Sequence, residues 1–217
     1  MIADGRGLID VGTDHGYLPV WLAKRGYPGR IYASDIHAAP LASARKTARV
    51  AAVEEKICFL CCDGLDLCPP EAIDTIVIAG MGGDTICGIL DRAEWILDKA
   101  YTLILQPMTK AEVLRYWLVN NGFTLTEEHL VREGGFLYQI IKARFIGNMT
   151  LSDAELYAGA LENLRAEELA GEWLDALLLR FEKEEKGLLS SEKRNEGRLS
   201  LCRSVRGGLQ KMKGELV

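Results

Sequence analysis

The chain has 217 residues, 48% of them hydrophobic, and a formal net charge of −5, which is enough to build one full domain and a smaller appendage. No segment approaches the ~18 uninterrupted apolar residues of a membrane span, and the N-terminus lacks the basic-then-apolar layout of a signal peptide, so we expect a cytoplasmic protein without a membrane partner. The negative net charge argues against indiscriminate binding of nucleic acid.

Five short apolar runs alternate with helical patterns over the first 121 residues. Runs with few polar interruptions are typical of strands covered on both faces. The predicted strands are 7–11, 31–34, 57–60, 75–79 and 102–106, and the predicted helices are 17–25, 39–52, 84–91 and 110–121. Two more extended runs, joined through Glu133-Gly134-Gly135, predict an edge hairpin. This order predicts an α/β fold with a doubly wound, Rossmann-like sheet.

The pattern changes after residue 148. Ser152 and Glu155 form a capping-box motif, and the chain then reads as helical to Lys213. Two apolar stripes follow at helical spacing: Leu174, Leu177, Leu178 and Phe181, then Leu199, Cys202, Val205, Leu209 and Met212, with Gly187 and Ser190-Ser191 between them. We therefore expect an antiparallel coiled-coil hairpin, and two domains at 1–148 and 149–217. The alternative, a solvated helical tail, would leave Trp173 and Phe181 exposed.

Four cysteines cluster in the segment KICFLCCDGLDLC. The spacing of Cys58, Cys61, Cys62 and Cys68 invites a metal site, but no histidine falls near them. Since they lie in and just after a predicted buried strand, we favour thiols that act as small apolar groups and predict no metal.

The first predicted strand ends in a glycine turn that contains two acids, Asp10 and Asp14, and two glycines, Gly12 and Gly16. A dinucleotide would place its diphosphate at such a turn and at the following helix N-terminus. The two carboxylates would oppose that anion, whereas they would favour the sulfonium and ammonium groups of S-adenosylmethionine. The turn therefore predicts a methyl donor.

Acids also end the next two predicted strands. Asp35 stands about 20 residues beyond the glycine turn, where a carboxylate accepts hydrogen bonds from ribose hydroxyls. Asp63 and Gly64 follow the third strand and are placed to meet the exocyclic amine of an adenine ring.

The motifs DVGTDHGYLP, CCDGLD, IVIAGMGG and LILQPM, in this order, resemble the bacterial tRNA (adenine(22)-N1)-methyltransferases, the TrmK-like class I enzymes that methylate N1 of one adenine in the D-arm of tRNA. The resemblance implies S-adenosylmethionine as cofactor, tRNA as partner, a C-terminal coiled-coil domain and an essential aspartate at Asp14. Where many amino-methylating relatives carry an Asn/Asp-Pro-Pro-aromatic motif, this chain has Gly80-Met81-Gly82-Gly83. The family also starts with a helix ahead of the first strand, so either the start is truncated or the cofactor pocket lacks its usual cover.

We accordingly predict a set of donor-binding residues at the strand ends and after the fourth strand. They are Asp10, Gly12, Asp14, Gly16, Asp35, Ile36, Asp63, Gly64, Ala79, Gly80 and Met81. For Met81, ordinary packing is the alternative.

Asp14 is the predicted catalytic residue. Positive charge grows on adenine as N1 takes the methyl group, and a carboxylate that accepts from the N6 amine would stabilise it. The alternative for Asp14 is an N-cap of the following helix. N1 lies on the Watson–Crick edge, so the base must be unpaired. The predicted substrate contacts beside the pocket are His15, Tyr17, Gln106 and Pro107.

The two halves of the helical tail carry opposite charge. Residues 151–186 hold ten acids against four bases, and residues 187–213 hold seven bases against two acids. The basic run predicts tRNA-phosphate contacts, with Arg194, Arg198 and Arg206 on one helical face. A solvated basic face is the plain alternative. At the level of function, a methyltransferase for another substrate and a donor-binding module with a protein-interaction hairpin stay open, and no obligate protein partner is inferred.

Overall fold

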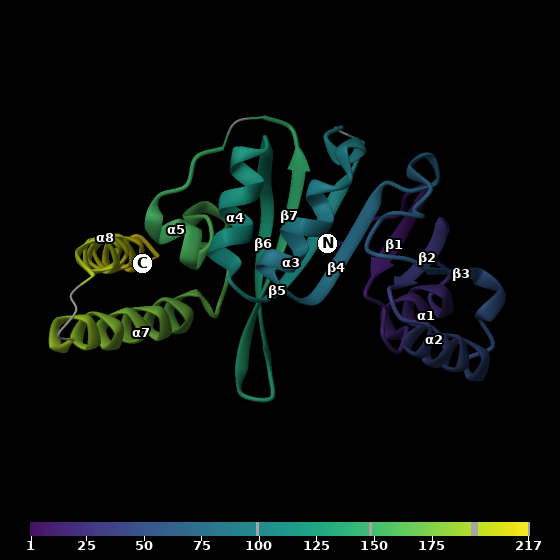
Figure 1. The fold of residues 1–217 in the computed structure, drawn as a ribbon, viewed down its shortest axis with the longest axis horizontal. Coiled ribbons are helices and arrows are strands. Elements are labelled where there is room, and N and C mark those ends of the chain that lie inside the picture. The colour runs from purple at the N-terminus through teal and green to yellow at the C-terminus, as the bar shows by residue number, and fades with distance from the viewer. Residues whose placement is uncertain (99, 148, 192–194, 217) are drawn as a thin grey trace.

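The computed structural model describes residues 1–98, 100–147, 149–191 and 195–216. Its centre is a seven-stranded sheet in the order β3-β2-β1-β4-β5-β7-β6 (Figure 1). The five parallel strands are β1 (Gly7–Val11), β2 (Arg30–Asp35), β3 (Ile57–Cys61), β4 (Thr75–Gly82) and β5 (Thr102–Thr109). The edge hairpin is β6 (Phe123–Glu133) and β7 (Phe136–Phe145), with β7 antiparallel to β5. The predicted doubly wound, Rossmann-like fold is confirmed.

Helices cover both faces of the sheet because successive strand residues point to opposite sides. Leu8 of β1 packs in one cluster with Val20 and Ala48, which come from α1 (Tyr17–Lys24) and α2 (Ala38–Val50). Its neighbour Ile9 packs in another cluster with residues of α3 (Gly83–Asp91) and α4 (Ala111–Asn120), such as Ile86 and Leu114. Short 3₁₀ turns lie at Glu54–Lys56, Pro70–Ala72 and Glu94–Ile96.

The position of β3 corrects the expectation for the cysteine cluster. β3 pairs with β2 alone and forms the edge of the sheet. Cys58 and Cys61 on it are therefore exposed, and Cys62 is partly exposed. Among these four, Cys68 is the one that is buried as an apolar thiol. Among the described residues, no group of three or more His, Cys, Asp or Glu side chains is arranged to hold a metal.

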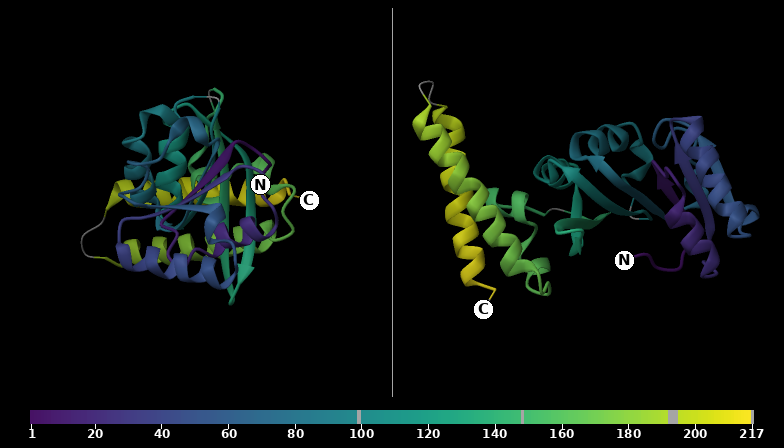
Figure 2. Two further views of the ribbon diagram at one scale, coloured as in Figure 1. Left: turned by 90° about the vertical axis from the view of Figure 1, so that its right-hand side faces the viewer. Right: turned by 90° about the horizontal axis from the view of Figure 1, so that it is seen from below.

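The C-terminal region folds into α5 (Asp153–Ala158), α6 (Leu161–Leu164), α7 (Ala170–Ser190) and α8 (Glu196–Gly214). The capping box at Ser152 and Glu155 is present. α7 and α8 lie side by side as a helical hairpin (Figure 2), and α7 runs through Gly187 without a break, whereas the sequence placed that residue between the helices. Both predicted stripes face the seam: Leu174, Leu177, Phe181, Leu199, Cys202, Val205, Leu209 and Met212 are buried, and Leu178 is partly buried.

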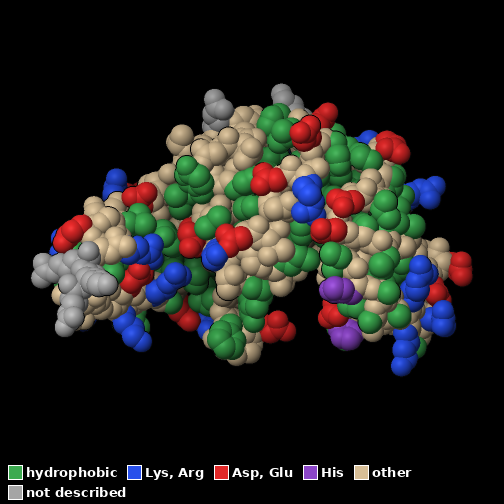
Figure 3. All heavy atoms as spheres, in the orientation of Figure 1, with side chains coloured by type: hydrophobic (Ala, Val, Ile, Leu, Met, Phe, Trp, Pro, Cys, Tyr) green, Lys and Arg blue, Asp and Glu red, His purple; other side chains and the backbone are tan. Residues whose placement is uncertain are grey.

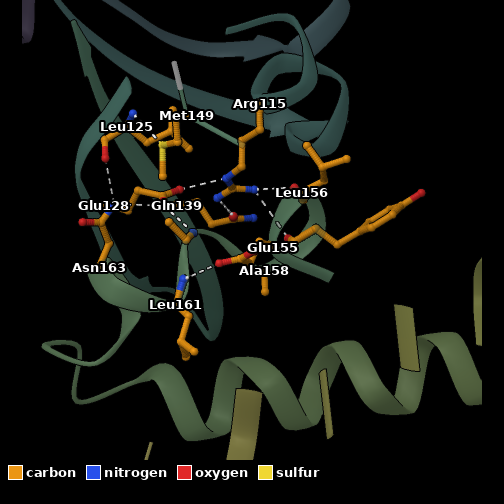
Figure 4. Close-up of polar contacts among 12 residues, drawn as sticks. Arg115, Leu125, Glu128, Gln139, Met149, Glu155, Leu156, Ala158, Leu161 and Asn163 are labelled. Atoms are coloured by element: carbon orange, nitrogen blue, oxygen red, sulfur yellow. Dashed lines mark hydrogen bonds and ion pairs between the residues drawn. The ribbon is translucent and has the colours of Figure 1, made fainter. Parts of the chain in front are cut away.

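A buried ion pair joins the sheet to this helical region (Figure 4). Arg115 on α4 and Glu128 on β6 have side chains only 1% and 4% exposed, and Arg115 Nε donates to Glu128 Oε1 at 2.8 Å. Arg115 also donates to the carbonyl of Leu156 at 2.9 Å, and Glu128 accepts from the backbone N–H of Ala160 at 2.7 Å. Each charge thus has partners on both sides of the junction, as burial requires. The expected boundary between residues 148 and 149 stays a prediction, and residue 148 itself lies outside the described residues.

Helices long and apolar enough to cross a membrane are absent from the described parts of the chain.

Candidate functional site

The turn that follows β1 is held in a tight, partly left-handed conformation. The backbone N–H groups of Gly12 and Thr13 both donate to the carbonyl of Ser34 on β2, at 2.8 and 2.9 Å. Gly12, Asp14 and Gly16 have φ values of 72°, 48° and 70°. Gly16 is also pressed against α2, because a Cβ there would lie 2.9 Å from the Cβ of Ala44. Glycine adopts this left-handed conformation without steric cost, and Asp is among the few other residues that tolerate it, so the sequence pattern correctly marks a shaped loop.

Asp10, at the end of β1, holds this loop through Thr13. It is 7% exposed, and its carboxylate accepts a hydrogen bond from Thr13 Oγ1 at 2.7 Å. Burial raises the pKa of Asp10 to about 6, and the Thr13 hydrogen bond offsets part of that increase. The structure therefore gives Asp10 a loop-supporting position at the end of β1, and its contact with the donor stays a prediction.

Asp14 lies on the outer side of the same turn, with a side chain 68% exposed. Its carboxylate is 3.6 Å from Nε2 of His15, and the ring of His15 lies 5.5 Å from that of Tyr17. The N-cap of α1 is Gly16, with no side-chain cap hydrogen bond. Asp14 therefore does not cap this helix, which was its alternative role. It is a non-glycine residue with a left-handed backbone, a conformation that is uncommon and often found at functional sites.

A cavity of ≈ 410 Å³ opens beside this turn at the carboxyl ends of the parallel strands. Six of the predicted donor-binding residues line it together: Gly12, Asp35, Ile36, Asp63, Gly64 and Met81. They come from three strand ends and from the segment that enters α3, which is where ligands bind in open parallel sheets.

The two acids of the cavity differ in their surroundings. Asp35 Oδ1 accepts from the backbone N–H of His37 at 2.9 Å, which orients the carboxylate at the end of β2. Asp63 pairs with Arg92, with 2.8 Å between Oδ1 and Nη2. Both groups of that pair are about half exposed, so the pair is weak and can rearrange around a ligand.

Met81 covers the glycine turn. A Cβ added to Gly12 would lie 2.1 Å from the Cε of Met81. Glycine at position 12 therefore provides both the left-handed backbone and the room for this thioether. Met81 is partly buried against the core, so packing and ligand contact are compatible roles for it.

Sequence reasoning missed the contribution of α3 to the cavity. Thr85, Ile89 and Arg92 also line it. They follow GMGG at spacings of four and three residues, which places them along one face of the helix. That periodicity was the available signal.

The comparisons with known proteins agree with this geometry. The family described as "Methyltransferase domain" matches residues 1–141. The structure of Streptococcus pneumoniae Sp1610, a protein proposed to be a tRNA (m1A22) methyltransferase, superposes with a TM-score of 0.83 at 29% identity, covering 98% of this chain and 94% of that one. The structure of Sp1610 with S-adenosyl-L-methionine gives a TM-score of 0.77 at 30% identity, covering 95% and 91%. The chain belongs to the TrmK-like methyltransferase family.

A curated relative is the tRNA (adenine(22)-N(1))-methyltransferase of Bacillus subtilis. It is 32% identical over 142 residues, which are 65% of this chain and 60% of that protein. The matched segment thus spans less than two thirds of the relative's length, although the structural likeness to Sp1610 includes the helical region.

The predicted substrate contacts of this TrmK-like protein divide into two groups. Tyr17 is 71% exposed beside Asp14 and His15. Gln106, by contrast, has its side-chain oxygen engaged by the backbone N–H of Gly80 at 2.9 Å. Gln106 and Ala79 line a separate, mostly apolar pocket of ≈ 860 Å³ near the N-terminus, together with Trp21. Gln106 therefore fixes the end of β4 next to β5, and its contact with a substrate stays a prediction, as does that of Pro107.

The basic run on α8 is engaged within the helical hairpin. Arg198 donates to Glu184, and Arg203 and Arg206 both donate to Glu185 on α7. The basic helix thus pairs with the acidic helix, and contact of Arg198 and Arg206 with tRNA phosphates stays a prediction. Arg194 lies outside the described residues.

Figure 3 shows where the site opens. Histidine and acidic side chains gather at the lower edge of the sheet domain, and the surface is hollowed between them and the tip of the β6–β7 hairpin.

Proposed function

We propose that this protein transfers the methyl group of S-adenosylmethionine to N1 of an adenine in tRNA, with adenine 22 of the D-arm as the target. The observation that carries the proposal is the single cavity in which Gly12, Asp35 and Asp63 meet at three neighbouring strand ends. The family of the chain and the donor bound in the Sp1610 structure support it.

The residues of the cavity fit the donor. Asp35 supplies an oriented carboxylate for the ribose hydroxyls, and Ile36 and Ile89 supply apolar walls for a planar adenine ring. Asp63 can accept from the exocyclic amine, and Gly12 forms the turn that lines the cavity beside Met81. When bound, the donor provides an electrophilic methyl group on a sulfonium.

Asp14 carries out the protein's part in the reaction. N1 of neutral adenine already has an in-plane lone pair, so no proton has to leave before it attacks the methyl carbon. The exposed carboxylate accepts from the N6 amine and stabilises the positive charge that grows on the base. His15 and Tyr17, which lie beside it, orient the base, and Pro107 contributes an apolar contact. We place the enzyme in the cytoplasm, with tRNA as its macromolecular partner.

The direct test is methyl transfer to an unmodified tRNA transcript with labelled S-adenosylmethionine, followed by mapping of 1-methyladenosine. We expect one methyl group per tRNA at adenine 22 and none in a transcript with guanine at that position. Transfer to free nucleosides or to protein at a comparable rate, with no transfer to tRNA, would contradict the proposal.

Calorimetric titration tests the donor site independently. We expect S-adenosylmethionine to bind, NAD to bind far more weakly, and Asp35→Ala to weaken donor binding by roughly tenfold or more, since a charged acceptor is lost. Glu55→Gln, at an exposed acid outside the cavity, is the matched control. Equal binding of NAD and S-adenosylmethionine would refute the assignment of the cavity.

A further inference from the structure

A second groove, of ≈ 430 Å³, lies between the β6–β7 hairpin and the helical region. One wall is the segment from Pro107 to Glu112, which runs from the end of β5 into α4, and another is the start of β7. Trp173 and Arg180 of α7 line the far side. The groove lies at the same edge of the sheet as the donor cavity, because Pro107 of the groove pairs with Met81 of the cavity where β5 runs beside β4.

Four of the side chains that line the groove are aromatic. Phe136 at the hairpin tip is 68% exposed, and Tyr138, Tyr157 and Trp173 accompany it. Trp173 is anchored because its Nε1 donates to the carbonyl of Ala158 at 2.9 Å, and Tyr157 is anchored because its hydroxyl accepts from Arg198 at 3.2 Å. Trp173 and Tyr157 thus form a fixed wall, and Phe136, which is exposed, and Tyr138, which is partly exposed, are the rings on which a base can stack.

Cations flank the rings. Lys110 and Arg180 line the groove, with Glu112 as the acid among its lining residues. Lys110 pairs with Asp84, but both side chains are more than half exposed, so a phosphate can take the place of Asp84 at little cost. Figure 3 shows hydrophobic side chains between the helical lobe and the hairpin, with Lys and Arg side chains nearby.

We propose that this groove binds an unpaired nucleotide of the RNA substrate while the target adenine occupies the donor site. The base stacks on Phe136 and Tyr138, and the phosphate contacts Lys110 and Arg180. The inference rests on the proposed function. Aromatic stacking combined with cations is the chemistry by which proteins hold single-stranded RNA, and the cavity volume falls within the range of about 300–1,000 Å³ of small-ligand sites.

RNA is the occupant that fits best, because the groove and the donor cavity lie at the same edge of the sheet. An adenine whose N1 is available is already unpaired, so neighbouring nucleotides in a loop or bulge are free to splay. A protein partner would not require the groove to connect with the reacting edge, and it would bury Phe136 without using the cations.

The test uses two groove variants, Phe136→Ala and Arg180→Glu. The two control variants are Tyr116→Ala, at an exposed side chain of α4, and Arg165→Glu, at the exposed pair with Glu215. The probe is the unmodified tRNA transcript, with KM, kcat and salt dependence of binding as readouts. We expect Phe136→Ala to raise KM roughly tenfold or more, with kcat at saturating tRNA and donor affinity near parental values. Arg180→Glu should reduce the log–log salt slope by about one. The controls should change neither quantity.

Ultraviolet crosslinking of the same tRNA to the parental protein gives a direct readout. We expect crosslinked peptides that contain Phe136, Tyr138 or Trp173. Parental KM and salt slope in both groove variants, together with crosslinks confined to α1 and α2, would overturn the groove while leaving the proposed function intact. A parental protein that binds donor but neither binds nor methylates tRNA would overturn both.

Discussion

Single residues in the glycine turn carry different tasks although they are close in sequence. Asp10 is buried and bonded to Thr13, whereas Asp14, four residues on, is exposed beside His15. Alternation of side-chain direction in β1, followed by a left-handed residue, sends the two carboxylates to opposite sides of the turn. In this turn, Asp10 supports the backbone, and Asp14 is the carboxylate that is available to a substrate.

We expect Asp14→Asn to reduce single-turnover methyl transfer at saturating donor on the order of a hundredfold or more, because a preorganised negative charge near the reacting base is lost. Donor affinity and the thermal unfolding midpoint should change little, since the side chain is largely exposed. Glu55→Gln provides the control for removal of one exposed charge. Near-parental turnover of Asp14→Asn would remove Asp14 from catalysis.

The raised pKa of Asp10 predicts that the free energy of unfolding depends on pH. Its folded-state pKa of about 6 lies above the ordinary value of 3.8, so the folded protein binds the proton more tightly than the unfolded chain. The contribution of Asp10 to the free energy of unfolding is therefore fully present below pH ~4 and is lost as pH rises through 6, by on the order of 3 kcal/mol. Urea unfolding at several pH values should show Asp10→Asn gaining stability relative to the parent between pH 4 and 7. A constant difference between the two proteins would contradict this.

At the scale of elements, α7 and α8 are joined by apolar packing and by complementary charge. Glu185, mostly buried, accepts from Arg203 and Arg206, which lower the pKa of its carboxyl group. A lowered carboxyl pKa means that this stabilisation is present at neutral pH and is lost as pH falls through the folded-state pKa. Charges on the outer flanks of an apolar seam set which helices pair and in which direction.

A charge swap tests this pairing. Glu185→Arg and Arg206→Glu should each lower the thermal unfolding midpoint by several degrees, because each puts like charges together at the seam. The double variant should recover much of the loss, since the attraction is restored with its polarity reversed. Lys211→Glu, at an 81% exposed side chain on the same helix, is the control. Additive losses in the double variant would show that the two residues do not interact.

At the scale of the whole molecule, the Arg115–Glu128 pair fixes how the helical region sits on the sheet (Figure 4). Its partners come from α4, β6 and the backbone of α5, so the network holds both parts in one orientation. That orientation places Trp173 and Arg180 across from the hairpin and so forms the second groove.

We expect Arg115→Met or Glu128→Gln alone to cost roughly 3–5 kcal/mol in the free energy of unfolding, because each leaves a buried charge without its partner. The double variant Arg115→Met/Glu128→Gln should be less destabilised than the sum of the two single changes. Arg49→Ala, at an exposed pair with Glu54, should change stability little. The measurement is urea unfolding followed by circular dichroism, and full additivity would argue against a coupled junction.

The sequence by itself determined the features that depend on local pattern. Apolar runs located the five parallel strands, glycines located the turn after β1, and two stripes located α7 and α8, because burial and backbone geometry impose fixed spacings on a chain. The tertiary structure alone decided which side chains meet across long separations. In the sequence, Arg198 and Arg206 stand in a basic run, and only the packing of α7 against α8 shows that they pair with Glu184 and Glu185. Likewise, Cys58 read as buried until β3 proved to be the sheet edge, since partners and exposure depend on which distant segment packs alongside.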